Sequence, residues 1–169
     1  MSTTETMTGI PVGTWTVDPV HSHLGFRVVD TSEMISSITG RFTDFEGTFE
    51  AGDDPRSARA HGSIRAASIA TDQEQRDAHL RSPDFFDVER FPEIRFESDA
   101  IEPLDGDRIR VRGRLVIKGV EQAVELEGRL VTGTSAKGEE RLVLDSQGGY
   151  SWGPMNVDIT ASISAAKSE

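Results

Sequence analysis

Residues 108–131, RIRVRGRLVIKGVEQAVELEGRLV, decide the fold class, because apolar and charged residues alternate on both sides of a Lys-Gly pair. Period-two alternation is typical of strands that bury one face and leave the other in water. Folding the stretch about residues 118–121 sets Leu115 opposite Val124 and Arg114 opposite Glu125. Opposite charges directly across an antiparallel pair stabilise it by about 0.2–1 kcal/mol. The stretch therefore predicts an antiparallel hairpin in that register.

The same alternation recurs along most of the chain, in GTWTVD (13–18), HSHLGFRVV (21–29), FEGTFEA (45–51), ARAHGSIRAAS (58–68), EIRFESDA (93–100) and MNVDITASISA (155–165). Eight or nine strands with one apolar face must either close into a barrel or stack as a sandwich. Many apolar-face positions are Gly or Ala, which would underfill a sandwich but leave room for one small ligand inside a barrel. We predict an all-β fold, a closed antiparallel β-barrel of about eight strands, with one short helix near residues 73–81 and a covering loop.

Composition narrows the function classes. The 169 residues carry a formal charge of −11 and contain no cysteine, which excludes disulfides and thiolate metal sites. The acidic balance disfavours nucleic acid and anionic membrane surfaces as partners. No secretory signal or membrane-spanning stretch is visible, so we expect a cytoplasmic protein that is not integral to a membrane. We expect a flexible segment over residues 1–12 and a single barrel domain over 13–165; a homodimer is left open.

Few side chains suggest chemistry. His21 and His23 share one face of a strand at a spacing used by metal sites, but alternation with Leu24 and Phe26 points them outward. We therefore predict surface histidines and no metal site. Nucleotide-binding motifs and a nucleophile turn are absent from the sequence, so we predict no cofactor and no catalytic residue.

One stretch departs from the strand pattern: RDAHLRSPDFFDVERFPEIRF, residues 76–96. Its adjacent Phe85 and Phe86 cannot both face the interior of a strand, because neighbouring side chains point to opposite faces. The stretch resembles the YceI-like family. WTVDPVHSHLGFRV (15–28), GRFTDFEGTF (40–49), ASIATDQEQRDAHL (67–80) and GRLVIKGVEQAVEL (113–126) are also similar to that family's pattern.

The resemblance implies a lipocalin-like barrel that binds polyisoprenoids or related long-chain lipids. In this interpretation residues 73–92 cover the barrel, and Phe85 or Phe86 is an apolar plug. Two segments depart from the family's pattern, DTSEMISSITGRF (30–42) and LDSQGGYSWGP (144–154). A change there is expected to alter ligand size or identity.

We therefore predict that the barrel interior sequesters or transports a long-chain apolar ligand, such as an isoprenoid, an isoprenoid quinone or a fatty-acid-like lipid. The predicted lining residues are Trp15, Leu24, Phe26, Val28, Phe45, Phe49, Ile64, Phe85, Phe86, Phe96, Leu115, Leu126 and Ile159. The predicted polar residues of the mouth are Arg76, Asp77, His79 and Tyr150. Two alternatives remain: a cofactor-free cyclase or isomerase that uses the same cavity, with those polar residues as acids or bases, and an interaction module with a filled barrel.

Overall fold

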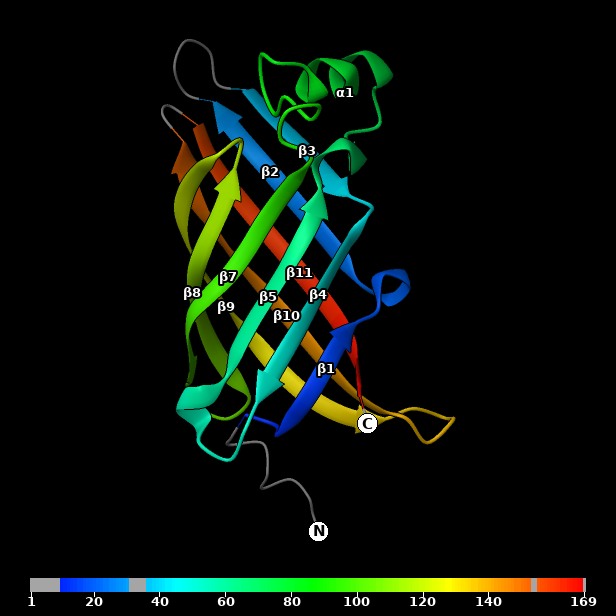
Figure 1. The fold of residues 1–169 in the computed structure, drawn as a ribbon, viewed down its shortest axis with the longest axis vertical. Coiled ribbons are helices and arrows are strands. Elements are labelled where there is room, and N and C mark those ends of the chain that lie inside the picture. The colour runs from blue at the N-terminus through cyan, green and yellow to red at the C-terminus, as the bar shows by residue number, and fades with distance from the viewer. Residues whose placement is uncertain (1–9, 31–35, 153–154, 169) are drawn as a thin grey trace.

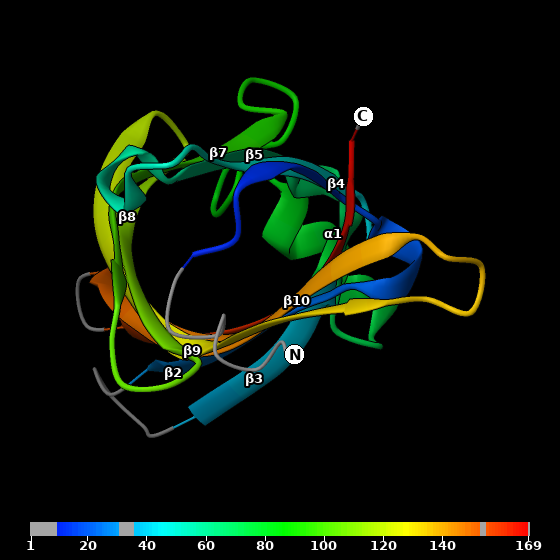
Figure 2. The same cartoon turned by 90° about the horizontal axis from the view of Figure 1, so that it is seen from below.

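A ring of eight antiparallel strands forms the body of the computed structural model, which describes residues 10–30, 36–152 and 155–168. In hydrogen-bonded order the ring contains β1 (Gly13–Val17), β4 (Phe45–Ala51), β5 (Arg59–Arg65), β7 (Glu93–Pro103), β8 (Arg108–Ile117), β9 (Val120–Thr134), β10 (Glu140–Trp152) and β11 (Met155–Lys167). Strand β11 pairs back onto β1, with Trp15 opposite Lys167 and Val17 opposite Ala165. The predicted closed antiparallel barrel is confirmed, and Figure 2 shows the ring from below.

Three further strands extend the sheet beyond β11: β2 (His23–Asp30), β3 (Ser36–Phe42) and β6 (Ile69–Ala70). Strands β1 and β2 pair with successive parts of β11, and the 3-10 turn η2 (Pro19–His21) separates the two strands. Two other 3-10 turns, η3 (Pro55–Ser57) and η4 (Ala66–Ser68), flank β5. The one α-helix among the described residues, α1 (Glu74–Arg81), lies at the upper end of the barrel (Figure 1), within the range expected for it. Among those residues no helix has the length and apolar character needed to cross a membrane.

The β8–β9 hairpin has the predicted faces but not the predicted register. Glu125 lies opposite Arg112 rather than Arg114, and Val124 lies opposite Gly113 rather than Leu115. The predicted four-residue turn was wrong: the turn is Lys118-Gly119 alone, with φ of 52° and 76°. A two-residue turn with positive φ at both positions matches the twist of the strands it joins. Because the register moves by two residues, every side chain keeps its face.

A β-bulge changes the inward row of β7. Strict alternation from Ile94 predicts that Ala100 faces inward, but the register shifts between Ser98 and Ala100. Beyond the bulge Ile101 is buried instead. The extra residue, Asp99, accepts a hydrogen bond from Arg114 Nε at 3.0 Å. The bulge thus places an isoleucine inside the barrel and a carboxylate beside the arginines of β8.

The buried core has two clusters at different heights in the barrel. The first includes Ile10, Trp15, Ala51 and Ala58, and it lies toward the end of the barrel where β1 begins and β11 finishes (Figure 1). The second includes Leu115 and lies toward α1. Most of the expected flexible N-terminal segment, residues 1–9, lies outside the described residues, but Ile10 of that segment is buried. We call the first region the closed end and the opposite region the covered end.

Candidate ligand-binding cavity

The barrel encloses a cavity of about 760 Å³ whose walls are mainly apolar side chains from the ring strands and from β2 and β3. A volume of that size falls within the range of small-molecule sites. Twelve of the thirteen predicted lining residues lie on its wall: Leu24, Phe26, Val28, Phe45, Phe49, Ile64, Phe85, Phe86, Phe96, Leu115, Leu126 and Ile159. Ten of the twelve lie on strands, where a side chain faces either the lumen or the solvent, whereas Phe85 and Phe86 belong to the loop that follows α1.

Trp15 is the exception among the predicted lining residues. It points inward, but it is buried to 2% exposure in the closed-end cluster and is not part of the cavity wall. It sits so near the end of the ring that its neighbours fill the space around the indole. Its Nε1 donor has no hydrogen-bond partner among the described residues.

Several lining residues were not predicted. Leu142 and Leu144 on β10 follow a visible alternation that the prediction did not use, and Ile163 lies on the same face of β11 as the predicted Ile159. Ile101 could not be found by alternation, because the bulge before it reverses the parity. Phe42, which the prediction did not include, belongs to the aromatic contacts below the helix.

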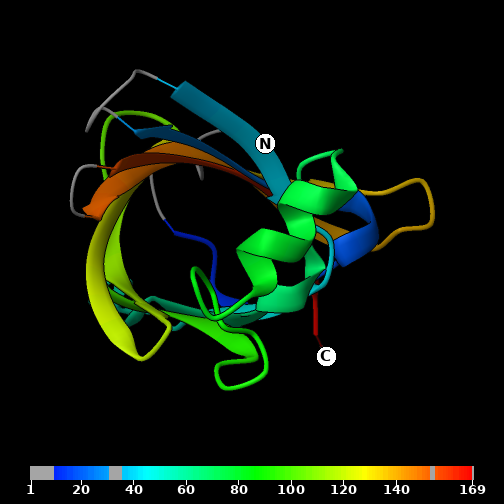
Figure 3. The same ribbon diagram turned by 90° about the horizontal axis from the view of Figure 1, so that it is seen from above.

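Helix α1 and the loop 82–92 lie over part of the opening at the covered end, as seen from above in Figure 3; we call them the cover. Phe86 points into the barrel and meets Phe42 edge to face, with ring centroids 6.1 Å apart. The ring centroid of Phe42 in turn lies 5.4 Å from the ring centroid of Phe26. Phe85 is 38% exposed and stacks edge to face on His79, at 4.9 Å. The two adjacent phenylalanines therefore differ: one continues the core, and the other lies at the rim of the cavity.

Two predicted mouth residues hold the cover to β6. Asp77 is buried and accepts two hydrogen bonds from Thr71. One comes from the Thr71 hydroxyl, and the other comes from the Thr71 backbone N–H at 2.9 Å. The hydrogen bond from the Thr71 hydroxyl is the largest influence that lowers the pKa of Asp77. Arg76 donates through Nε to the Thr71 hydroxyl and through Nη2 to the Thr71 carbonyl, both at 2.9 Å. Because these groups are engaged with each other, their role in this geometry is to anchor the helix.

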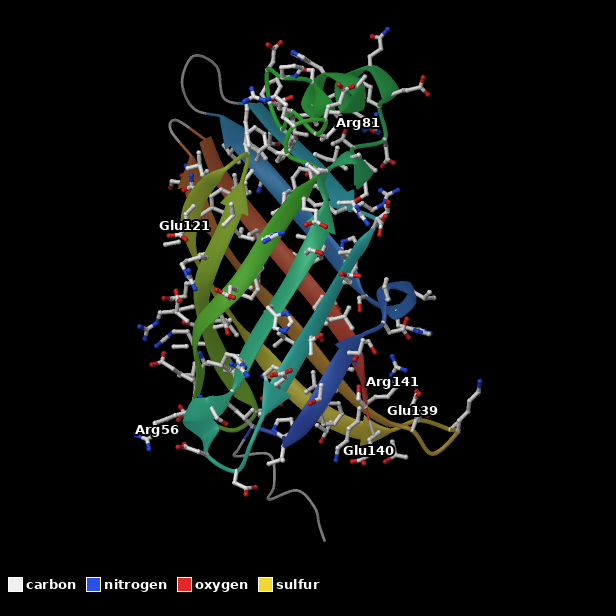
Figure 4. The ribbon with its side chains drawn as sticks, viewed as in Figure 1. Arg56, Arg81, Glu121, Glu139, Glu140 and Arg141 are labelled. Atoms are coloured by element: carbon white, nitrogen blue, oxygen red, sulfur yellow. The ribbon has the colours of Figure 1, made fainter. Side chains whose placement is uncertain are left out.

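Further contacts fix the cover to the barrel. Lys118, in the β8–β9 turn, donates from Nζ to the carbonyl of Pro83 at 2.9 Å. Arg81, labelled at the upper end in Figure 4, donates from Nε to the carbonyl of Ala67 at 3.0 Å. A Cβ atom at Gly119 would come within 3.1 Å of the Phe91 ring, so the loop packs closely on the turn.

Tyr150 lines the cavity and packs against the second cluster. Burial raises the pKa of its phenol to about 12, because the ionised form would lose its hydration. The group therefore stays protonated at any physiological pH. Ser146, on the same strand, is also buried, but its hydroxyl donates to the carbonyl of Ala161 at 3.1 Å.

The two predicted surface histidines lie away from the cavity. His21 and His23 are exposed, and His21 Nδ1 lies 2.6 Å from Asp18 Oδ2. The same carboxylate accepts a hydrogen bond from Arg141 at 3.0 Å; Arg141 is labelled near the lower end of the barrel in Figure 4. The contact with His21 is the largest influence that lowers the pKa of Asp18 to about 2. In the described part of the chain no cluster of His, Asp and Glu could hold a metal ion.

Comparison with solved structures supports the fold. BcnA from Burkholderia cenocepacia matches with a TM-score of 0.70 at 19% identity, over 88% of this chain and 98% of that one. A Campylobacter jejuni YCEI protein matches with a TM-score of 0.71 at 21% identity, over 80% and 88%. A polyisoprenoid binding domain from Saccharophagus degradans matches with a TM-score of 0.65 at 14% identity, over 94% and 100%.

Sequence comparison gives the family. Protein YceI of Salmonella newport and that of Escherichia coli O157:H7 are each 32% identical over 130 residues, which cover 76% of this chain. The matched region spans 66% of the length of these relatives. The pattern of the YceI-like domain matches residues 15–165, which include the whole ring except the ends of β1 and β11. The chain therefore belongs to the YceI-like domain family.

Proposed function

We propose that this protein binds a long-chain apolar molecule inside the barrel, as a carrier or a store rather than as an enzyme. The observation that carries the proposal is the apolar cavity of about 760 Å³, which is filled by side chains at one end and partly covered at the other. The polyisoprenoid binding domain of similar fold supports an isoprenoid, an isoprenoid quinone or another lipid of that kind as the ligand.

The energetics of such a site need no charged group. Burying one methylene contributes about 0.8 kcal/mol. Micromolar affinity corresponds to about 8 kcal/mol, so about ten buried methylenes supply it before the costs of immobilising the ligand. A cavity wall almost without free polar groups fits that requirement.

The alternative of a cofactor-free enzyme lacks support from the mouth residues. Asp77 and Arg76, two of the four candidates for acid–base work, are engaged with Thr71. His79 lies 3.1 Å from Asp84 on the exposed side of the cover. No described pair of free acid and base faces the lumen.

The proposal is tested by filling the cavity from its wall. Ala60 lines the lumen on β5, and its neighbour Arg59 is exposed and lies outside the cavity wall. We expect Ala60→Phe to weaken binding of the hydrocarbon fluorophore diphenylhexatriene at least tenfold, whereas Arg59→Phe, the same ring on the outer face, leaves binding unchanged. Gly62 is a poorer choice, because a Cβ atom there would lie 2.6 Å from the carbonyl of Glu46.

Binding that survives in a folded Ala60→Phe protein would exclude the interior as the site. Fluorophore binding that is lost equally in both variants would point to a disturbed fold. Circular dichroism and the urea midpoint of each variant distinguish these outcomes.

A further inference from the structure

Tyr150 occupies a distinctive place in the cavity. It lies two residues before β10 ends at Trp152, opposite Val157 of β11. That end of β10 is at the same height as the cover (Figure 1). Its ring packs against the second cluster and forms part of the cavity wall. The phenol is thus a polar group in an apolar wall, near the covered end.

The hydroxyl of Tyr150 is available as a donor. No hydrogen bond joins it to another described residue, and the side chain is only partly buried, so the oxygen is accessible from the cavity. Burial keeps the phenol protonated, since it raises the pKa to about 12. A neutral phenol in a cavity can donate one hydrogen bond to a guest. A guest that supplies an acceptor would take the place of water at that donor, in apolar surroundings where the hydrogen bond is stronger than in water.

The other polar residues of the cavity wall are occupied or turned away. Arg76 is bound to Thr71, Lys118 to Pro83, and Ser146 to Ala161. His79 and Asp84 contact each other. The remaining polar wall residues alternate with the inward Gly47 and Gly62 and therefore point outward: Glu46, Thr48, His61 and Ser63.

We propose, on the basis of the proposed function, that Tyr150 is the polar anchor of the cavity and donates a hydrogen bond to an uncharged carbonyl oxygen at the head of the ligand. The apolar tail then runs from the covered end toward the cluster around Trp15. A ketone-type or quinone-type oxygen fits, whereas a carboxylate does not. A buried carboxylate would need a counter-charge, and the described cationic side chains of the wall, Arg76 and Lys118, already bind protein oxygens.

The test compares three probes that share one isoprenoid chain. They are the methyl ketone farnesylacetone, the hydrocarbon in which a methylene group replaces its oxygen, and the carboxylic acid of equal chain length. Each displaces diphenylhexatriene from the wild-type protein and from Tyr150→Phe, which removes only the hydroxyl. We expect the variant to bind the ketone about fivefold more weakly, the effect of one lost hydrogen bond. We expect it to bind the hydrocarbon as well as the wild type does.

Val157→Ala is the matched control, because it trims an apolar group directly across from Tyr150. It should weaken the ketone and the hydrocarbon by the same factor. Tyrosinate absorbance adds a second readout, since Tyr150 is the only tyrosine in the chain. Bound ketone should delay its appearance as the pH rises, by more than bound hydrocarbon does.

Each result decides the matter. If Tyr150→Phe leaves ketone binding unchanged, or weakens both neutral probes equally, the anchor is overturned while the proposed function stands. Tighter binding of the acid than of the ketone by the wild type would overturn the choice of an uncharged head group. If the wild type binds none of the three probes, the proposed function itself fails, and the anchor fails with it.

Discussion

The closed end and the covered end of the barrel are held by different kinds of interaction. At the closed end, β1 pairs with both β4 and β11, and Trp15 fills the space inside with 2% of its surface exposed. At the covered end, the helix and loop are held by side chains that reach backbone oxygens, among them Lys118 and Arg81, and by the partly buried Phe86 against the second cluster. Burial of a large ring stabilises far more than one exposed hydrogen bond. We infer that the closed end stabilises the fold, and that the covered end can open locally without unfolding the barrel.

The largest effect is expected at the closed end. Trp15→Ala should lower the free energy of unfolding by about 3–5 kcal/mol, because it empties a fully buried site. Urea denaturation measures this loss. A loss below about 1 kcal/mol would remove the basis for assigning stability to the closed end.

The two phenylalanines of the cover should give unequal, intermediate effects. Phe86→Ala should cost about 2 kcal/mol, less than a fully buried phenylalanine, because Phe86 is only partly buried against Phe42. Phe85→Ala should cost less than about 1 kcal/mol, as for other surface substitutions, yet should speed release of diphenylhexatriene. The comparison needs stopped-flow release rates and urea midpoints for each variant. Equal stability losses with unchanged release rates would mean that both phenylalanines only pack in the core and that neither retains the ligand.

A smaller change in stability is expected from Lys118→Met, which keeps the aliphatic stem but removes the donor to Pro83. The stability should change by less than about 1 kcal/mol, because the bond is exposed. Probe release should become a few times faster, since the loop loses one of its contacts with the β8–β9 turn. Arg59→Met, which removes an exposed charge far from the cover on β5, is the control and should not alter release.

The smallest effect on stability is expected at low pH, from Asp18, whose carboxylate contacts His21 of η2 and Arg141 of β10. Its pKa is lowered to about 2 from 3.8, first by the contact with His21, so the folded state favours the carboxylate. The stability that it contributes is present above about pH 4 and is lost as the pH falls toward 2. Asp18→Asn should therefore show a shallower loss of thermal midpoint across that window, with probe release unchanged at pH 7. Parallel curves for the variant and the wild type would exclude Asp18 from acid unfolding.

Alternation, the small residues on the apolar faces and the family resemblance together predicted the barrel. Alternation also assigned ten of the lining residues to the inner faces of strands, because the period of a strand determines which side chains share a face. It could not give the hairpin register, which depends on whether Lys118 adopts a positive φ. It also could not reveal the inward Ile101, since one inserted residue reverses parity. The roles of Asp77 and Arg76 depended on the position of Thr71, which precedes the helix and shows no periodic signal. Tyr150 was predicted at the mouth, but only the three-dimensional structure shows that no described residue forms a hydrogen bond with its hydroxyl.

The pairing of β1 with β11 has a consequence for the way the chain acquires its fold. The ring is closed by segments from opposite ends of the sequence, Trp15 and Lys167. Bringing such distant segments together carries a large loop-closure entropy, and contacts of this kind slow folding. During synthesis the ring cannot close until β11 has left the ribosome, and until then β1 lacks its β11 partner and β10 has a free edge. Unpaired strand edges attract other chains, so the nascent protein is most prone to aggregation just before its last strand arrives.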